Sequence, residues 1–218
     1  MFEAVIFDCD GVLVDSEALG LEDSAHYLQS HGLDWSPADL VRLFTGLRDD
    51  VFAAKLTEAY RKVHGAAPLP EFFSGLVEQR RKKKDQLQAV SGAHEALRAI
   101  RQSIAVASSS RTEFLTSKLK RVDLWALTAP HVYSADLVPH GKPAPDIFLY
   151  AARKLGAAPE TCVVVEDSVN GVKAGVAAGM TVFGFTGGGH CFDGHGERLI
   201  DAGAAKVARD FPSLVAQL

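Results

Sequence analysis

Two aspartates, Asp8 and Asp10, stand directly after the short apolar run 4–7. Such a run, ended by turn residues, is typical of a buried strand, and parallel sheets bind ligands where their strands end. A carboxylate can attack phosphorus, and a second carboxyl group can protonate the leaving oxygen and later take a proton from water. Because Gly11 permits a turn, both acids can face one crevice, where a divalent cation would relieve their repulsion. The alternative for this cluster alone is a plain turn rich in Asp and Gly.

Two further clusters suit a bound phosphate. Ser108 and Ser109 follow the apolar run 104–107, and hydroxyl groups and free backbone N–H groups at a helix start bind anions. Lys142 lies in a proline-stiffened turn, where its charge could offset phosphate and keep a neighbouring carboxylate ionised. Taken singly, these clusters also fit helix capping and an exposed turn lysine.

A second acid pair, Glu166 and Asp167, follows the apolar run 162–165. Oxygen ligands at strand ends suit a hard cation such as Mg²⁺, which usually keeps several waters. Helix N-capping by Asp167 or Ser168 is the alternative interpretation.

The elements that must position these groups alternate along the chain. Continuously apolar strands separated by amphipathic helices predict a parallel sheet covered on both faces, an α/β fold. The predicted strands are 4–7, 104–107, 162–165, 181–185 and, more weakly, 206–208. Among the helices, Gly179 is placed to end the one over 172–178.

Residues 17–88 show no convincing strand and predict an all-helical block inserted after the first strand. Ala18, Leu21, Ala25 and Leu28 share one helical face, Ser36 is an expected N-cap, and 51–63 and 72–87 read as helices. We therefore expect a core of residues 1–16 and 89–218 and a helical cap of residues 17–88. The basic run 80–84 indicates a solvated helix face, with an anion-facing cation as the alternative.

Composition limits the other classes of function. The 218 residues are 47% hydrophobic and 23% charged with a net charge of −4, so the chain can form a core and has no global attraction to nucleic acid or an anionic membrane. Three scattered cysteines support neither a disulfide framework nor a zinc ribbon. With no leader and no long apolar run, a cytoplasmic protein without membrane contact is expected. The sequence does not decide between a monomer and a small homo-oligomer.

The order of these clusters resembles the haloacid dehalogenase-like hydrolase superfamily, within its subgroup of β-phosphoglucomutases and sugar-phosphate phosphatases. The similarity rests on DxDGVLVDSE at 8–17, Ser108, GKPxPDIF at 141–148 and EDSxxGxxAG at 166–175, and spans essentially the whole chain. It implies a Rossmann-like core with a helical cap inserted after the first strand.

The resemblance also implies roles. Asp8 would be the nucleophile and Asp10 the general acid and base, while Ser108, together with Ser109, and Lys142 would bind the transferring phosphoryl group. Mg²⁺ would be held by the Asp8 carboxylate, the Asp10 backbone carbonyl and Asp167, with Glu166 as a ligand or in support. The partner would be a small phosphorylated metabolite, such as a sugar or polyol phosphate.

Phosphatase and phosphomutase are both open, and dehalogenation is disfavoured because members that cleave carbon–halogen bonds lack the second acid, here Asp10. Mutases carry a histidine where this chain has Gly20, which favours a phosphatase. Gly46 and Arg48 resemble the cap loop that touches substrate, with the arginine offset by one position from the mutase pattern. A non-enzymatic receiver-like phospho-switch is a remote alternative, since receivers lack the DxD pair and the helical insertion.

The glycine-rich segment 187–196 contains His190, Cys191 and His195. Their spacing matches no standard zinc signature and a fourth ligand is missing, so a flexible loop near the cap is expected.

Overall fold

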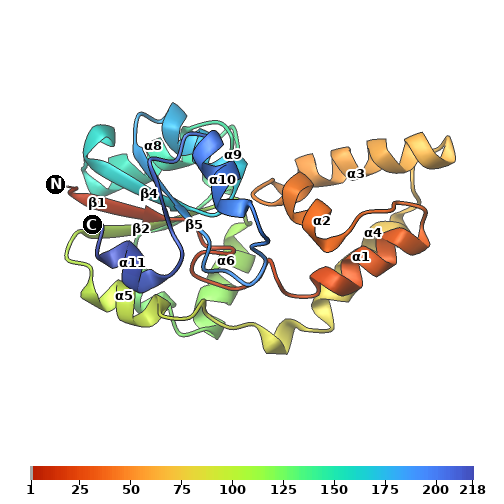
Figure 1. The fold of residues 1–218 in the computed structure, drawn as a ribbon, viewed down its shortest axis with the longest axis horizontal. Helices are drawn as coiled ribbons and strands as arrows, with labels where there is room; N and C mark the ends of the chain where they lie inside the picture. Colours follow the sequence, from red (N-terminus) through yellow and green to blue (C-terminus); the bar gives the residue numbers. More distant parts are fainter. Residues whose placement is uncertain (1) are drawn as a thin grey trace.

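The computed structural model describes residues 2–218, apart from the side chain of Arg80. A six-stranded, fully parallel sheet with the strand order β3-β2-β1-β4-β5-β6 forms the centre of the larger part of the molecule (Figure 1). The strands are β1 (Ala4–Phe7), β2 (Ser103–Ser108), β3 (Val132–Ser134), β4 (Cys162–Glu166), β5 (Thr181–Phe185) and β6 (Lys206–Ala208). This is the strand order of doubly wound dinucleotide-binding folds, in which ligands bind beside the central strand.

Helices cover both faces of the sheet. On one side lie α5 (Ala93–Ala99), α6 (Thr112–Arg121), α7 (Trp125–Thr128) and α11 (Phe211–Val215), and on the other α8 (Asp146–Leu155), α9 (Val169–Ala177) and α10 (His195–Asp201). Short 3₁₀ turns η2 (Ala135–Leu137) and η3 (Pro159–Thr161) join some of them.

Strand β1 shows why a continuously apolar run was needed. Val5 and Phe7 belong to the hydrophobic cluster on one face of the sheet, and Ala4 and Ile6 to the cluster on the other, all with no exposed surface. Because successive side chains of a strand point to opposite faces, a strand covered on both sides must be apolar at every position. The α/β fold predicted from the sequence is confirmed.

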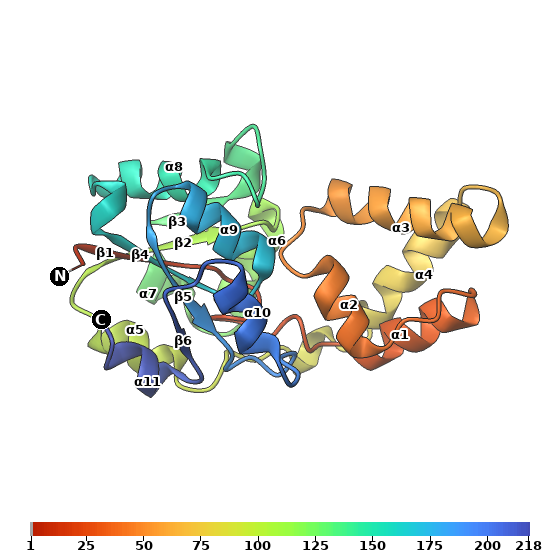
Figure 2. The same cartoon turned by 45° about the horizontal axis from the view of Figure 1, so that its top comes forward.

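A second, smaller body is entirely helical (Figure 2). It consists of α1 (Leu21–Ser30), α2 (Pro37–Phe44), α3 (Asp49–His64) and α4 (Pro70–Arg81), followed by the 3₁₀ turn η1 (Lys84–Gln86). Its buried residues form a hydrophobic cluster of their own, drawn only from positions 21–76. Ser36 caps α2 with a full capping box, as its position before Pro37 predicted.

Two neighbouring chain segments connect the two bodies. Asp15 N donates to Gln88 O at 3.0 Å, and Val14 forms an antiparallel bridge with Ala89. Paired crossings of this kind suit a hinge, so we propose residues 17–88 as a cap domain on a core of 1–16 and 89–218.

Two local expectations were wrong, and one strand was not predicted. Helix α1 begins at Leu21 rather than near Ala18, because Gly20 before it is left-handed with φ of 67°. The helix expected over 72–87 ends at Arg81 and gives way to η1. Strand β3 was missed, since its three residues sit at the sheet edge and carry no apolar run.

The basic run 80–84 is mostly solvated where it is described, with Arg80 outside the described side chains. Lys83 pairs with Asp23 at 2.5 Å, and Arg81 lies 3.6 Å from Glu78. None of the described helices is both long and apolar enough to cross a bilayer.

Candidate active site

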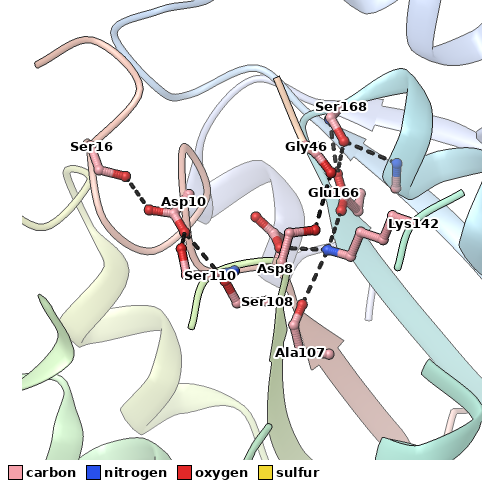
Figure 3. A network of polar contacts seen from close by, with 12 residues as sticks. Asp8, Asp10, Ser16, Gly46, Ala107, Ser108, Ser110, Lys142, Glu166 and Ser168 are labelled. Atoms are coloured by element: carbon pink, nitrogen blue, oxygen red, sulfur yellow. Dashed lines mark hydrogen bonds and ion pairs between the residues drawn. The ribbon is translucent and has the colours of Figure 1, made fainter. Parts of the chain in front are cut away.

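The predicted chemical groups meet at the carboxyl ends of β1, β2 and β4, beside the central strand of the sheet (Figure 3). Asp8 directly follows β1, Ser108 ends β2, and Glu166 ends β4. Parallel strands end at the same edge, so groups separated by up to about 160 positions in the chain become neighbours.

Asp8 and Glu166 are joined by a buried lysine. Lys142 Nζ donates to Asp8 Oδ1 at 2.5 Å, to Glu166 Oε1 at 2.7 Å and to the Ala107 carbonyl at 3.1 Å. All three of its donors are used, and its side chain is 1% exposed. Although burial alone would lower it, the charges of Asp8 and Glu166 raise the pKa of Lys142, which keeps this residue protonated.

Several neighbouring groups shift the pKa of Asp8 in opposite directions. Burial raises the pKa of Asp8, Lys142 lowers it, and the neighbouring carboxylates Glu166 and Asp167 raise it again, so the net pKa lies well above its ordinary value. Lys142 therefore does not by itself secure the ionised nucleophile that the sequence predicted. A second cation at this point would do so.

Glu166 holds Lys142 through one carboxylate oxygen and is itself held through the other. Its other oxygen, Oε2, accepts from the Ser168 backbone N–H at 2.8 Å and from the Ser168 hydroxyl at 2.9 Å. The carboxylate packs where Gly171 has no side chain, since a Cβ there would come within 1.7 Å of Oε1. With both oxygens engaged, Glu166 is suited to hold Lys142 rather than to be a direct metal ligand.

Asp10 lies on the other side of Asp8 with a different set of partners. Its Oδ2 accepts from Ser110 Oγ at 2.8 Å and from Ser108 Oγ at 3.2 Å, while Ser16 and Lys118 both contact Oδ1. Burial alone would raise its pKa, but Lys118 and the hydroxyl groups of Ser16 and Ser110 hold the pKa of Asp10 well below the ordinary value.

Lys118 is the residue that sequence reasoning missed. It comes from α6, between the buried Leu115 and Leu119, and also donates to Ser110 at 2.9 Å. A lysine on an amphipathic helix is usually solvated, and only the packing of α6 beside Asp10 in the folded protein shows that Lys118 has this role.

Lys118→Met should destabilise the protein by about 2–3 kcal/mol at pH 7.5, which is less than the about 3–5 kcal/mol typical of breaking a fully buried ion pair because the two side chains are 17–19% exposed. A depressed carboxyl pKa contributes stability above the unfolded value of about 3.9 and loses it as pH falls. The deficit should therefore shrink towards pH 4, where the unpaired Asp10 of the variant takes up a proton. Urea denaturation at both pH values measures this.

Lys120→Met, on the exposed side of the same helix, is the control. It loses a cation–π contact with Trp125 at 5.4 Å, worth about 1 kcal/mol or less and independent of pH in this range. An equal loss in both variants would contradict the ion pair as the source of the stability.

Asp167 is buried and contacts two histidines, His190 through its carboxylate and His195 through its backbone carbonyl. It is 1% exposed, His190 Nε2 lies 2.8 Å from its Oδ2, and its backbone carbonyl accepts from His195 Nε2 at 2.6 Å. Burial raises the pKa of Asp167 to about 6, and hydrogen bonding and the charge of Asp167 raise the pKa of His190 to about 11 against the opposing effect of burial. The segment expected to be a flexible loop, 187–196, is irregular only up to Gly194, since α10 begins at His195, and His190 within it is fully buried.

The donor set fits Mg²⁺. Asp8 and Asp167 are buried carboxylates with raised pKa values, and among the described residues Asp167 Oδ2 has only the His190 ring as a polar contact, at 2.8 Å. Gly11, with φ of 80°, lets the chain pass so close that a Cβ would lie 2.0 Å from that oxygen. An all-oxygen, negatively charged cluster of this kind suits a hard divalent cation.

The cap loop at 45–48 contacts the site from the opposite side. Ser109 Oγ donates to the Gly46 carbonyl at 3.0 Å, and a Cβ on Gly46 would lie 2.3 Å from Ser168 Oγ. Arg48 precedes α3, is one-third exposed and packs against Gly141, next to Lys142. Ser109 therefore joins core to cap in this structure.

An α/β core with its acids and lysine at one edge, facing a helical cap, defines a capped hydrolase-type enzyme. The haloacid dehalogenase-like hydrolase family model matches residues 2–179, and the chain belongs to this family. It is thus an enzyme whose curated relatives include phosphatases.

Three relatives illustrate the likeness. A phosphorylated carbohydrates phosphatase of Thermotoga maritima is 32% identical over 95% of this chain and 94% of its own. A 6-phosphogluconate phosphatase of Escherichia coli is 28% identical over 91% and 86%. The crystal structure of a HAD family hydrolase from Deinococcus radiodurans, with bound phosphate and sodium, is 36% identical over 98% and 93%, with a TM-score of 0.76.

Proposed function

We propose that the protein is a Mg²⁺-dependent phosphatase that hydrolyses a small phosphate monoester, a sugar or polyol phosphate, through an aspartyl phosphate on Asp8. The observation that carries the proposal is the buried Asp8–Lys142–Glu166 chain with Asp10 beside it. The names of the curated phosphatases support the substrate class.

The reaction would proceed in two displacements. The Asp8 carboxylate attacks phosphorus, the ester bond breaks, and Asp10 gives its proton to the leaving alkoxide. Asp10 then takes a proton from water, whose oxygen attacks the aspartyl phosphate and releases inorganic phosphate and free Asp8. For the first proton transfer Asp10 must separate from Lys118, because that contact holds it ionised.

The charge of Lys142 and the hydroxyl groups of Ser108 and Ser109 would face the negative charge that spreads over the equatorial phosphoryl oxygens. Bound Mg²⁺, held by Asp8, Asp167 and the Asp10 carbonyl, would supply charge neutralisation for the phosphoryl group and the nucleophile. Closure of the cap, whose loop 45–48 faces the site, would exclude bulk water from the site.

Phosphate release across a panel of sugar, polyol and nucleotide monoesters tests the proposal. We expect the highest kcat/KM for a phosphorylated sugar or polyol. No release from any monoester under Mg²⁺ would refute it.

A separate assay distinguishes the phosphomutase alternative. Gly20 directly precedes α1 in a left-handed conformation and presents no side chain that could act as the mutase histidine does. With β-glucose 1-phosphate and catalytic glucose 1,6-bisphosphate, we expect free phosphate, whereas glucose 6-phosphate without phosphate would favour the mutase.

Removal of divalent cations should stop turnover. Excess EDTA is expected to abolish phosphate release and added Mg²⁺ to restore it, because Asp8 and Asp167 otherwise repel one another and the phosphate. Asp167→Asn should need a higher Mg²⁺ concentration for half-maximal activity. Undiminished activity in chelator would remove the metal from the proposal.

A further inference from the structure

The segment after β5 gathers three metal-binding side chains beside Asp167. His190, Cys191 and His195 each offer a ligand atom, and the three atoms all lie within 4.8 Å of one another. Two backbone turns bring them together, from Cys191 N to Gly188 O at 3.2 Å and from His195 N to Phe192 O at 3.0 Å. The spacing of these three residues in the sequence matches no standard zinc signature, so the sequence alone did not indicate that they lie together.

The hydrogen bonding of His195 prepares it as a ligand. A carbonyl can only accept, so the 2.6 Å contact to the Asp167 carbonyl fixes the Nε2 atom of His195 as the donor. In the neutral ring this leaves the lone pair on Nδ1. In metal sites, a backbone carbonyl that accepts from the other ring nitrogen commonly orients the histidine in this way.

His190 lies close to two other potential metal-ligand atoms. Its Nε2 is 3.7 Å from Cys191 Sγ and 2.8 Å from Asp167 Oδ2. At this distance His190 and Asp167 form a buried ion pair, and the other ring nitrogen of His190, Nδ1, has no hydrogen-bond partner among the described residues. A cation bound by both side chains would replace the ion pair.

We propose that His190, Cys191 and His195 bind Zn²⁺ or a similar soft divalent cation, with Asp167 as the fourth ligand. Imidazole and thiolate select such metals, whereas Mg²⁺ prefers the oxygen donors of Asp8 and Asp167. Zn–N bonds of about 2.0 Å and Zn–S bonds of about 2.3 Å place tetrahedral ligand atoms about 3.3–3.6 Å apart. From 4.8 Å, the widest separation in the His190–Cys191–His195 cluster must shrink by about 1.2–1.5 Å, whereas His190 Nε2 and Asp167 Oδ2, 2.8 Å apart, must separate slightly.

The shared ligand makes the two cations antagonists. Zn²⁺ bound to Asp167 Oδ2 withdraws that oxygen from the Mg²⁺ site, so Zn²⁺ should inhibit turnover and excess Mg²⁺ should oppose it. This consequence rests on the proposed phosphatase function, but the binding site itself does not.

Titration of the full chain with Co²⁺ in place of Zn²⁺ tests the site without an activity assay. We expect a thiolate-to-cobalt charge-transfer band and intense visible bands of four-coordinate cobalt, all displaced by Zn²⁺. Cys191→Ser should lose the charge-transfer band, and Cys162→Ser, at a buried thiol in β4, should retain it. Absence of the band in the wild type, or its persistence in Cys191→Ser, would overturn the site.

Inhibition provides a second readout. Cys191→Ser should keep the basal rate and raise the Zn²⁺ concentration for half-inhibition by at least about ten-fold, as for loss of a contact that supports a metal. His195→Asn should also raise the Zn²⁺ concentration for half-inhibition. If no phosphatase activity exists, the cobalt spectra still decide the site, and unchanged Zn²⁺ inhibition in both variants would reject the antagonism.

Discussion

Asp8→Asn is expected to lower phosphate release by at least about 10⁴-fold, since loss of a nucleophile costs on that order or more. The amide cannot form the acyl phosphate, although its oxygen can still accept from Lys142. The fold should survive. The pKa of Asp8 is raised well above its ordinary value, so its ionisation at neutral pH costs free energy that the neutral amide avoids.

Asp10→Asn is the matched control for this experiment. With an activated ester such as p-nitrophenyl phosphate, whose leaving group needs no proton, the first displacement should proceed. Hydrolysis of the aspartyl phosphate should then slow by about 10²–10⁴-fold, and the phosphorylated protein should accumulate. Intact-mass spectrometry would detect the added phosphoryl group in Asp10→Asn and not in Asp8→Asn. Phosphorylation of the Asp8→Asn variant would assign the nucleophile elsewhere.

The sequence was informative where the residues that do the chemistry directly follow a segment whose pattern identifies a buried strand. The run Ala4–Phe7 is apolar at every position because both faces of β1 are covered, and the acids follow where it ends. Parallel pairing then places the ends of β1, β2 and β4 side by side, so Asp8, Ser108 and Glu166 could be predicted as one site.

The remaining partners depend on packing that no local pattern encodes. Lys118 is a helix lysine until α6 docks beside Asp10, and His190 is a loop histidine until its turn packs against Asp167. The direction of the Asp8 pKa also could not be predicted. Sequence reasoning placed a lysine next to the nucleophile, but not the complete burial that outweighs the lysine's charge.

Lys142→Met should combine a large loss of activity with a large loss of stability. Removing the ammonium leaves Asp8 and Glu166 as buried carboxylates without their counter-charge, which costs about 3–5 kcal/mol. Loss of the positive charge beside the developing phosphoryl charge should lower kcat by about 10²–10³-fold. Urea denaturation without metal and steady-state kinetics with Mg²⁺ measure the two effects.

The pH profile separates the electrostatic role of Lys142 from a merely structural one. Lys142 lowers the pKa of Asp8, so its removal raises that pKa further, and the nucleophile must be ionised to react. The acid limb of kcat/KM should therefore move to higher pH in Lys142→Met. Glu166→Gln is the comparison, because it removes a neighbouring negative charge and should move the same limb to lower pH. An acid limb that stays in place in both variants would show that Lys142 and Glu166 do not set the ionisation of Asp8.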